Sequence, residues 1–157
     1  MTKKLVAYFS ASGTTETVAK RLAQATGADL FEIVPETIYT DADLDWRDPN
    51  SRCVAEMKDR SARPAIASHV ADMSSYDTIF VGFPIWAYRE PGIIDTFLES
   101  YDFSGKTLAP FATSGGSGMG ECSDNFRTLA PGATVAEGRR FSPQATVAEL
   151  AAWAEEL

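Results

Sequence analysis

Short apolar runs that alternate with stretches of helical periodicity are the feature that most constrains the fold of this chain. The runs LVAYF (5–9) and DTIFVGFP (77–84) are almost entirely apolar, which is typical of strands buried on both faces of a sheet. The segment TTETVAKRLAQATGA follows the first run, places Val18 and Leu22 on one stripe, and contains the stop signal Gly27. Strands that alternate with helices form parallel sheets through right-handed crossovers, with helices on both faces.

Weaker signals extend this alternation to five strands and several helices. We expect further strands at 29–35, 106–114 and 134–141, the last of them charged, as suits an edge strand. Further helices are expected over 91–100 and within 120–129. The pattern predicts an α/β fold with a doubly wound, five-stranded parallel sheet.

Two proline positions test this reading of the element boundaries. Pro110 lies inside a strand expected in the sheet interior, where proline cannot donate to the ladder, so we expect a bulge there. At the C-terminus, Ser142 is the expected helix cap and Pro143 the first helical residue. The expected buried stripe of this last helix consists of Val147, Leu150, Ala154 and Leu157.

The length of 157 residues favours a single domain spanning 1–157. The least regular part, 36–76, is acidic and turn-rich at first and then patchily helical, and we interpret it as an excursion within that domain. It contains Trp46, which is a candidate to cover a ligand or to build a second pocket.

Composition excludes several classes of function. Lys and Arg total 14 against 22 Asp and Glu, and this net charge of −8 disfavours binding to nucleic acid or to anionic membranes. It suits a partner that docks through a basic face. No apolar run approaches the ~20 residues of a membrane span, so we expect a cytoplasmic protein. Cys53 and Cys122 form no motif, and we expect neither a metal site nor a catalytic residue.

The first unusual loop is SASGTT (10–15), between the first strand and the first helix. The free amides and the positive end of the helix dipole point into this loop, and Gly13 permits a close backbone approach. Ser10, Ser12, Thr14 and Thr15 add hydroxyl groups, so the loop predicts a nest for one phosphate. An ordinary helix cap is the alternative.

Two further loops follow the third and fourth expected strands. GFPIWAYREP (82–91) exposes Trp86 and Tyr88 among turn residues, where a flat apolar ligand would give them a stacking partner. TSGGSGMG (113–120) is glycine-rich and offers bare backbone groups to a polar ligand edge. Taken alone, the first loop favours a Trp86 that packs under the loop, and the second favours a flexible connector.

The coincidence of the three loops carries more weight than any one of them. In a sheet of order 2-1-3-4-5, strands one, three and four are neighbours around the point where the strand order reverses, and ligands bind there. One phosphate, one flat ring and one polar ring edge together describe FMN.

These motifs resemble the flavodoxin family over nearly the whole chain. SASGTT matches the family's phosphate loop [ST]-x-[ST]-G-x-[ST], with Thr14 where asparagine is frequent, and FPIWAYREP resembles the loop beside the flavin ring. PFATSGGSG resembles the third loop of a short flavodoxin-like subgroup. The resemblance implies a flavodoxin-like fold of strand order 2-1-3-4-5 and an FMN cofactor.

The resemblance also implies a role for each loop residue. The phosphate would be held by Ser10, Ser12, Gly13, Thr14 and Thr15. The ring would be flanked by Pro84, Ile85, Trp86, Ala87 and Tyr88, with Trp86 the main and Tyr88 the second stacking candidate. Its pyrimidine edge would meet Thr113, Ser114, Gly115 and Gly116.

We therefore expect a one-electron carrier, a monomer or weak dimer that docks transiently on reductases and acceptors. The alternatives are an FMN-dependent NAD(P)H oxidoreductase of the quinone or flavin reductase type and a non-flavin phosphate-binding domain. The phosphate loop lacks cations and the chain is acidic, which predicts a low flavin potential. Arg89 is expected to be solvated, or else to offset this negative field.

Overall fold

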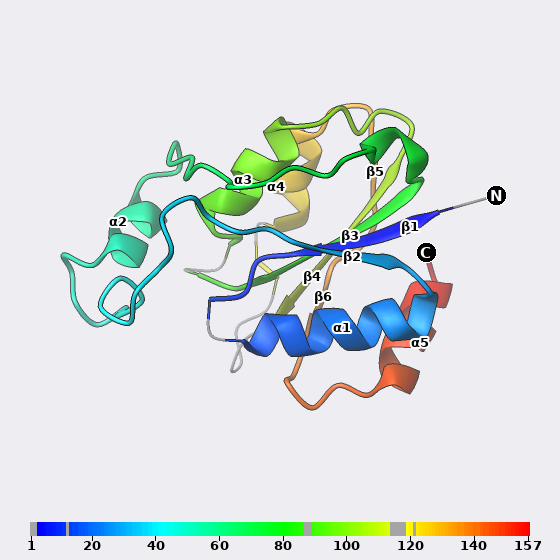
Figure 1. The fold of residues 1–157 in the computed structure, drawn as a ribbon, viewed down its shortest axis with the longest axis horizontal. Helices are drawn as coiled ribbons and strands as arrows, with labels where there is room; N and C mark the ends of the chain where they lie inside the picture. The colour runs from blue at the N-terminus through cyan, green and yellow to red at the C-terminus, as the bar shows by residue number, and fades with distance from the viewer. Residues whose placement is uncertain (1–2, 12, 87–88, 114–118, 121) are drawn as a thin grey trace.

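The computed structural model describes residues 3–11, 13–86, 89–113, 119–120 and 122–157. A parallel sheet of order β2-β1-β3-β4-β5 runs through its centre (Figure 1). This order and the flanking helices confirm the predicted doubly wound α/β fold. The strands are β1 (Lys4–Tyr8), β2 (Asp29–Glu32), β3 (Thr78–Pro84), β4 (Thr107–Thr113), β5 (Thr134–Val135) and β6 (Arg139–Phe141).

The fifth position of the sheet is divided between β5 and β6, where one strand over 134–141 was expected. β5 pairs with β4 at Thr107 and Leu108, and β6 pairs with β4 from Phe111 onward. The Leu108 carbonyl accepts a hydrogen bond from Ala136 N at 2.8 Å, and the next peptide group of β4 that faces this side belongs to Pro110. Because proline has no amide hydrogen, the ladder cannot continue there. Between Leu108 and Phe111 β4 advances by three residues, while the edge strand advances by four, from Val135 to Arg139. One extra residue therefore lies opposite Pro110, in agreement with the expected bulge, and the edge strand is interrupted there.

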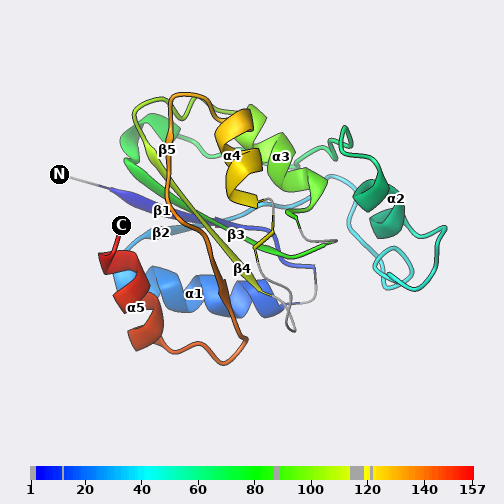
Figure 2. The same ribbon diagram turned by 180° about the vertical axis from the view of Figure 1, so that it is seen from behind.

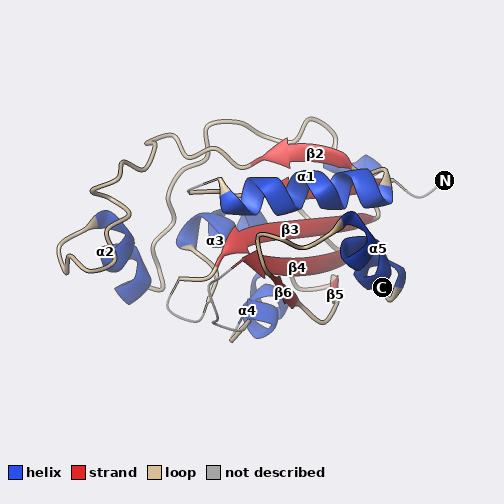
Figure 3. Ribbon diagram, turned by 90° about the horizontal axis from the view of Figure 1, so that it is seen from below, coloured by secondary structure: helices blue, strands red, loops and turns tan. Residues whose placement is uncertain are grey.

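Helices cover both faces of the sheet. α1 (Thr14–Thr26) and α5 (Val147–Glu155) lie on one face, and α3 (Gly92–Glu99) and α4 (Cys122–Leu129) lie on the other (Figures 1 and 2). α2 (Arg52–Lys58) belongs to the excursion and lies beyond the carboxyl ends of the strands (Figure 3), and a short 3-10 turn (Met73–Ser75) precedes β3. None of the helices in the described ranges is long and apolar enough to cross a membrane.

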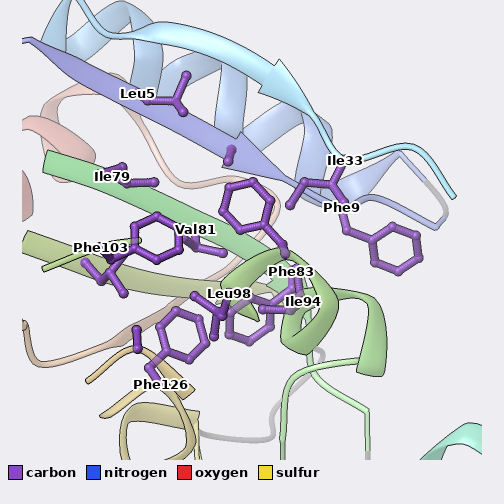
Figure 4. Close-up of a cluster of buried hydrophobic side chains, with 14 of the residues drawn as sticks. Leu5, Phe9, Ile33, Ile79, Val81, Phe83, Ile94, Leu98, Phe103 and Phe126 are labelled. Carbon is purple, nitrogen blue, oxygen red and sulfur yellow. The ribbon is translucent and has the colours of Figure 1, made fainter. Parts of the chain in front are cut away.

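Aromatic side chains dominate the core on both faces of the sheet. On the α3 and α4 face, Phe83 and Phe126 (Figure 4) are fully buried, as is Phe97 of α3. On the other face, Phe111 packs against Trp153 of α5. A Cβ atom at Gly82 would lie 2.2 Å from the Phe111 ring, so close packing between β3 and β4 requires glycine at position 82.

Two element boundaries differ from those expected. The C-terminal helix begins at Val147, and its cap is Thr146, whose hydroxyl accepts from Glu149 N at 3.1 Å. The residues before it form a turn, whose carbonyls at 143 and 145 accept hydrogen bonds from Arg21. Trp153 fills the core in place of Leu157, which is 44 % exposed.

The second strand is also shorter than expected. β2 ends at Glu32, and Pro35 makes an isolated antiparallel bridge with Ile66 of the excursion. The segment after β2 is therefore tied to the excursion and does not extend the central sheet.

Candidate cofactor site at the carboxyl edge of the sheet

The three unusual loops leave the same edge of the sheet, side by side. Phe9 N, just after β1, donates to the Gly82 carbonyl of β3 at 2.9 Å. Ile85 N, just after β3, donates to the Thr113 carbonyl at the end of β4 at 3.1 Å. These two hydrogen bonds place the chain segments that leave β1, β3 and β4 next to one another, as the strand order predicted.

The first loop turns into α1 at a glycine that the backbone requires. Gly13 caps the helix with φ 91°, in the left-handed region, although a side chain there would meet no atom within 4 Å. The Ser10 hydroxyl accepts hydrogen bonds from Gly13 N at 3.0 Å and from Glu16 N at 3.1 Å. Its own hydrogen is left to donate to an anion in the loop. Ser12 lies outside the described residues.

The two threonines of the first loop occupy different environments. Thr14 is half-buried at the first position of α1, whereas Thr15 is 1 % exposed. The Thr15 Oγ1 lies 2.8 Å from the Oγ1 of Thr113, which is 3 % exposed at the end of β4. This hydrogen bond joins the first and third loops. It uses one of the two hydroxyl hydrogens and leaves the other for a ligand.

The second loop holds Trp86 in an aromatic cluster with Phe9 and Tyr39. The Trp86 ring centroid lies 5.9 Å from that of Phe9 and 5.6 Å from that of Tyr39, with interplanar angles of 88° and 75°. Such edge-to-face contacts are favourable and fix ring orientation. Pro84 and Ile85 are half-buried beside Trp86, while Ala87 and Tyr88 lie outside the described residues.

Tyr39 is the member of this cluster that sequence reasoning missed. Its hydroxyl donates to Glu56 of α2, and the Arg52 guanidinium lies 3.8 Å from its ring centroid. Arg52 Nε is also 2.9 Å from Glu56 Oε2. Burial and the neighbouring Glu56 raise the pKa of Tyr39 well above its usual range. The excursion is thereby attached to the aromatic loop through Tyr39, whereas Trp46, the candidate expected for this role, is 71 % exposed.

The third loop begins at the buried Thr113. Ser114, Gly115 and Gly116, expected to meet the ring edge, lie outside the described residues. Of the predicted site residues that are described, the structure brings Ser10, Gly13, Thr14, Thr15, Pro84, Ile85, Trp86 and Thr113 to one edge of the sheet.

A buried charged group lies directly behind the aromatic loop. Arg89, expected to be solvated, is only 6 % exposed, and its Nη2 donates to Asp95 Oδ2 at 2.7 Å. Its backbone exchanges two hydrogen bonds with Trp86, of 3.0 and 3.2 Å. The expectation was wrong because Asp95, one helical turn into α3, supplies a buried counter-charge.

Glu90 completes this buried group. Its carboxylate oxygens accept from Asn125 Nδ2 at 3.0 and 3.2 Å, and Glu90 Oε2 lies 3.6 Å from Arg89 Nε. Burial, followed by the charge of Asp95, raises the pKa of Glu90 to about 8. These surroundings therefore favour the protonated form of Glu90.

Other reactive side chains contribute little near this edge. His69 is exposed, and Cys53 and Cys122 are buried free thiols. Burial raises the pKa of Cys122 to about 12, so its nucleophilic thiolate form is suppressed. Across the described ranges, no group of three or more His, Cys, Asp or Glu residues is placed to hold a metal ion.

The chain is similar to known proteins in both sequence and fold. The family model described as Flavodoxin matches residues 3–157. A "putative flavoprotein" from Bacteroides eggerthii is 43 % identical with a TM-score of 0.93, covering 99 % of this chain and 98 % of its own. Another from Bacteroides uniformis is 45 % identical with a TM-score of 0.92, covering 98 % of each chain. No curated protein matches.

A more distant relative was solved with a ligand. It is a flavoprotein from Lactobacillus acidophilus, in complex with FMN. It is 25 % identical with a TM-score of 0.71, covering 89 % of this chain and 93 % of its own.

Proposed function

This chain belongs to the flavodoxin family, and from that premise we propose that it binds FMN at the carboxyl edge of the sheet and carries electrons between redox proteins. The observation that supports this most directly is the convergence of three loops at one edge, tied by the Thr15–Thr113 hydrogen bond of 2.8 Å. The Lactobacillus acidophilus relative was solved in complex with FMN.

The first loop is suited to the phosphate group of FMN. The N-terminus of α1 offers backbone amides and the positive end of its dipole, and Gly13 leaves its surroundings open. Ser10 is oriented by the two amides that donate to it, so that its hydrogen is free for an anion. Ser12, Thr14 and Thr15 complete the proposed set. No Lys or Arg stands in SASGTT, so the phosphate charge would be solvated by dipoles and not neutralised.

The second and third loops are suited to the ring. Trp86 is braced by Phe9 and Tyr39 before any ligand arrives, which lowers the entropy lost on binding. Pro84, Ile85, Ala87 and Tyr88 complete the proposed flank of the ring. Thr113, Ser114, Gly115 and Gly116 are proposed for its polar edge, where backbone groups fix orientation.

When bound, FMN would supply the capacity to accept and release electrons, and the protein would set the ease of that exchange. A cation-free phosphate loop in a chain of charge −8 disfavours additional negative charge on the ring. Each ~1.4 kcal/mol of such repulsion corresponds to about 60 mV for a one-electron step. The arrangement therefore favours a strong electron donor.

An absorption spectrum of the purified protein tests the proposal. We expect flavin bands in the protein as isolated, or on addition of FMN, with a 1:1 endpoint in fluorescence titration. Protein that stays colourless and does not quench added FMN would instead support the non-flavin phosphate-binding alternative.

An NAD(P)H oxidoreductase is the second candidate, and the position of the excursion favours it. Tyr39 packs on Trp86, so the excursion borders the proposed ring site and is placed to help shape a substrate pocket. Stopped-flow mixing of the FMN-loaded protein with NADH and NADPH separates the two functions. A carrier shows slow flavin bleaching, whereas an oxidoreductase shows rapid bleaching that saturates with nucleotide concentration.

A further inference from the structure

Two buried carboxyl groups lie next to each other behind the aromatic loop. Glu90 and Asp95 are 1 % and 2 % exposed, and their side chains are within hydrogen-bonding reach of each other. Asp95 Oδ2 accepts from Arg89, whereas Asp95 Oδ1 accepts from no N–H or hydroxyl group of the described residues. Two ionised carboxylates have no hydrogen atom between them, but a proton on one lets it donate to the other. The arrangement of the pair therefore favours one shared proton.

One buried cation serves these two carboxyl groups. Across the described ranges, the buried charged side chains are those of Arg89, Glu90 and Asp95. Arg89 donates to Asp95 at 2.7 Å but lies 3.6 Å from Glu90, beyond hydrogen-bonding range. Glu90 instead accepts from the neutral amide of Asn125. Two carboxylates against one guanidinium would leave an uncompensated negative charge in the interior, and one bound proton removes that charge.

Further charged and titratable groups border the pair. They are Glu99 of α3, Cys122 of α4, and Glu56, Arg60 and Arg63 of the excursion. Arg63 pairs outward with Glu99 at 2.6 Å, Glu56 pairs with Arg52, and Arg60 also has a partner. Burial raises the pKa of the Cys122 thiol to about 12, so this group is neutral. The bordering groups are therefore paired or neutral, which leaves Glu90 and Asp95 as the groups that bind the proton.

The pair adjoins the proposed flavin site through the aromatic loop. Arg89 directly precedes Glu90 and exchanges two backbone hydrogen bonds with Trp86. Trp86 and Glu90 also border the same narrow space, which has no room for a water molecule. Across such a dry contact, two charges interact with little screening by solvent. A charge on a ring that stacks on Trp86 is therefore felt at the pair.

From this arrangement we propose that the Glu90–Asp95 pair is a proton-binding site that couples electron transfer to proton uptake. The coupling rests on the proposed function, because bound FMN holds the electron. In its doubly ionised form, the pair takes one proton from water when one electron enters the flavin site from a donor protein. It returns the proton to water when the electron leaves. One positive and one negative charge enter together, so the net charge of this region does not change.

NMR of the protein without FMN, labelled with ¹³C at the glutamate carboxyl carbons, tests whether the pair holds a proton. The Glu90 signal, assigned by its absence in Glu90→Gln, should titrate with a midpoint near its raised pKa of about 8. Glu155, which is exposed on α5, is the internal reference and should titrate near the ordinary glutamate pKa of about 4.3. A Glu90 signal that titrates together with that of Glu155 would overturn the proposal, whatever the result with FMN.

Potentiometric titration of the FMN-loaded protein between pH 6 and pH 10 tests the coupling. Loss of the shared proton adds a negative charge, so the wild-type potential, measured relative to that of Glu90→Gln, should fall as the pair ionises. We expect reduction to tighten proton binding by the pair about tenfold. Because the coupling is reciprocal, this tenfold change corresponds to a total fall of about 60 mV for a one-electron step. Glu155→Gln should follow the wild type.

Asn125→Ala provides a second variant that keeps both carboxyl groups. The Asn125 amide donates to Glu90 and stabilises its ionised form, which lowers the pKa of Glu90. Its removal should therefore move both the NMR midpoint and the fall of the potential to higher pH. A midpoint that moves without any change in the potential profile would contradict the coupling.

FMN binding and proton coupling can be refuted separately. Protein that takes up no FMN contradicts the proposed function and removes the coupling with it. Protein that takes up FMN, but whose potential has the same pH dependence in the wild type and in Glu90→Gln, supports FMN binding and overturns the coupling.

Discussion

The hydroxyl oxygens of Thr15 and Thr113 lie 2.8 Å apart although 98 positions separate the two residues in the sequence. Both side chains are buried, and they join the start of α1 to the end of β4. The bond holds together two of the three loops at the candidate cofactor site, so its removal should affect both stability and ligand binding.

Thr15→Val tests this connection. The substitution keeps the shape of the side chain but leaves the Thr113 hydroxyl buried without its partner, which costs about 1–3 kcal/mol of unfolding free energy. FMN affinity should also fall, by tenfold or more, in fluorescence titration. Thr15→Ser retains the hydroxyl and serves as the control. A Thr15→Val protein with the stability and FMN affinity of the Ser variant would show that the hydrogen bond has no role.

Gly13→Ala should weaken FMN binding through the backbone. The residue has φ 91°, which costs a non-glycine residue about 1 kcal/mol or more. The first turn of α1 should shift to relieve the strain and misplace the amides that face the phosphate. Gly105→Ala is a matched control, because Gly105 has φ 78° and open surroundings but lies in the turn before β4, at the opposite edge of the sheet.

Urea denaturation and FMN titration separate the two glycine variants. Both should lose similar stability, and only Gly13→Ala should lose affinity. Equal affinities would contradict a role for the first loop in phosphate binding.

Tyr39→Leu should loosen the aromatic loop. The substitution removes ring contacts with Phe9 and Trp86 together with the hydrogen bond to Glu56. Aromatic pairs contribute about 0.5–1.5 kcal/mol each beyond area burial, so we expect FMN affinity to fall about tenfold. Trp46→Ala removes a larger but exposed aromatic from the same excursion and should leave affinity unchanged. A larger loss of FMN affinity in Trp46→Ala than in Tyr39→Leu would instead assign to Trp46 the role expected from the sequence.

Stability should depend on pH through Glu90. Its pKa in the folded protein is raised to about 8, above the usual glutamate value, so the folded state keeps a proton that the unfolded state releases. This contribution to stability is fully present below the unfolded pKa of about 4.3 and is lost as pH rises toward 8. Unfolding free energy should therefore fall by about 1.4 kcal/mol per pH unit across this window, several kcal/mol in total.

Glu90→Gln isolates this effect. Glutamine keeps an acceptor for Asn125 and stays neutral, so the variant should lose less stability than the wild type between pH 5 and pH 8. Glu155→Gln, at an exposed position of α5, should leave the pH profile unchanged. Parallel profiles for the Glu90 variant and the wild type would show that Glu90 is ionised throughout.

The fold was largely predictable because its determinants are local. The apolar runs that became β1, β3 and β4 and the stripe of α1 can be read within windows of a few residues. The first turn of the last helix was misplaced because Ser142 and Thr146 are both good caps. Hydrogen bonds from Arg21, which is distant in sequence, stabilise the turn that precedes the helix.

The candidate site was predictable only in part, because some of its contacts join residues that are distant in sequence. The loops reveal themselves by composition, but the burial of Arg89 depends on Asp95 and on a pocket assembled from α3 and α4. Tyr39 lies in an irregular segment, and its contact with Trp86 arises from tertiary packing that no periodicity signals. The i, i+4 pair of Arg52 and Glu56 is a local sequence signal for α2, the helix that contacts Tyr39.

The interrupted fifth strand also affects whether the edge of the sheet can pair with a strand of another chain. Exposed strand edges are templates for pairing with other chains, and short or broken edges resist it. One edge of this sheet offers β2, of four residues, and the other offers β5 and β6, of two and three residues. Pro110 interrupts the ladder between β5 and β6, so this edge offers an incoming strand no continuous surface, which disfavours edge-to-edge pairing between copies.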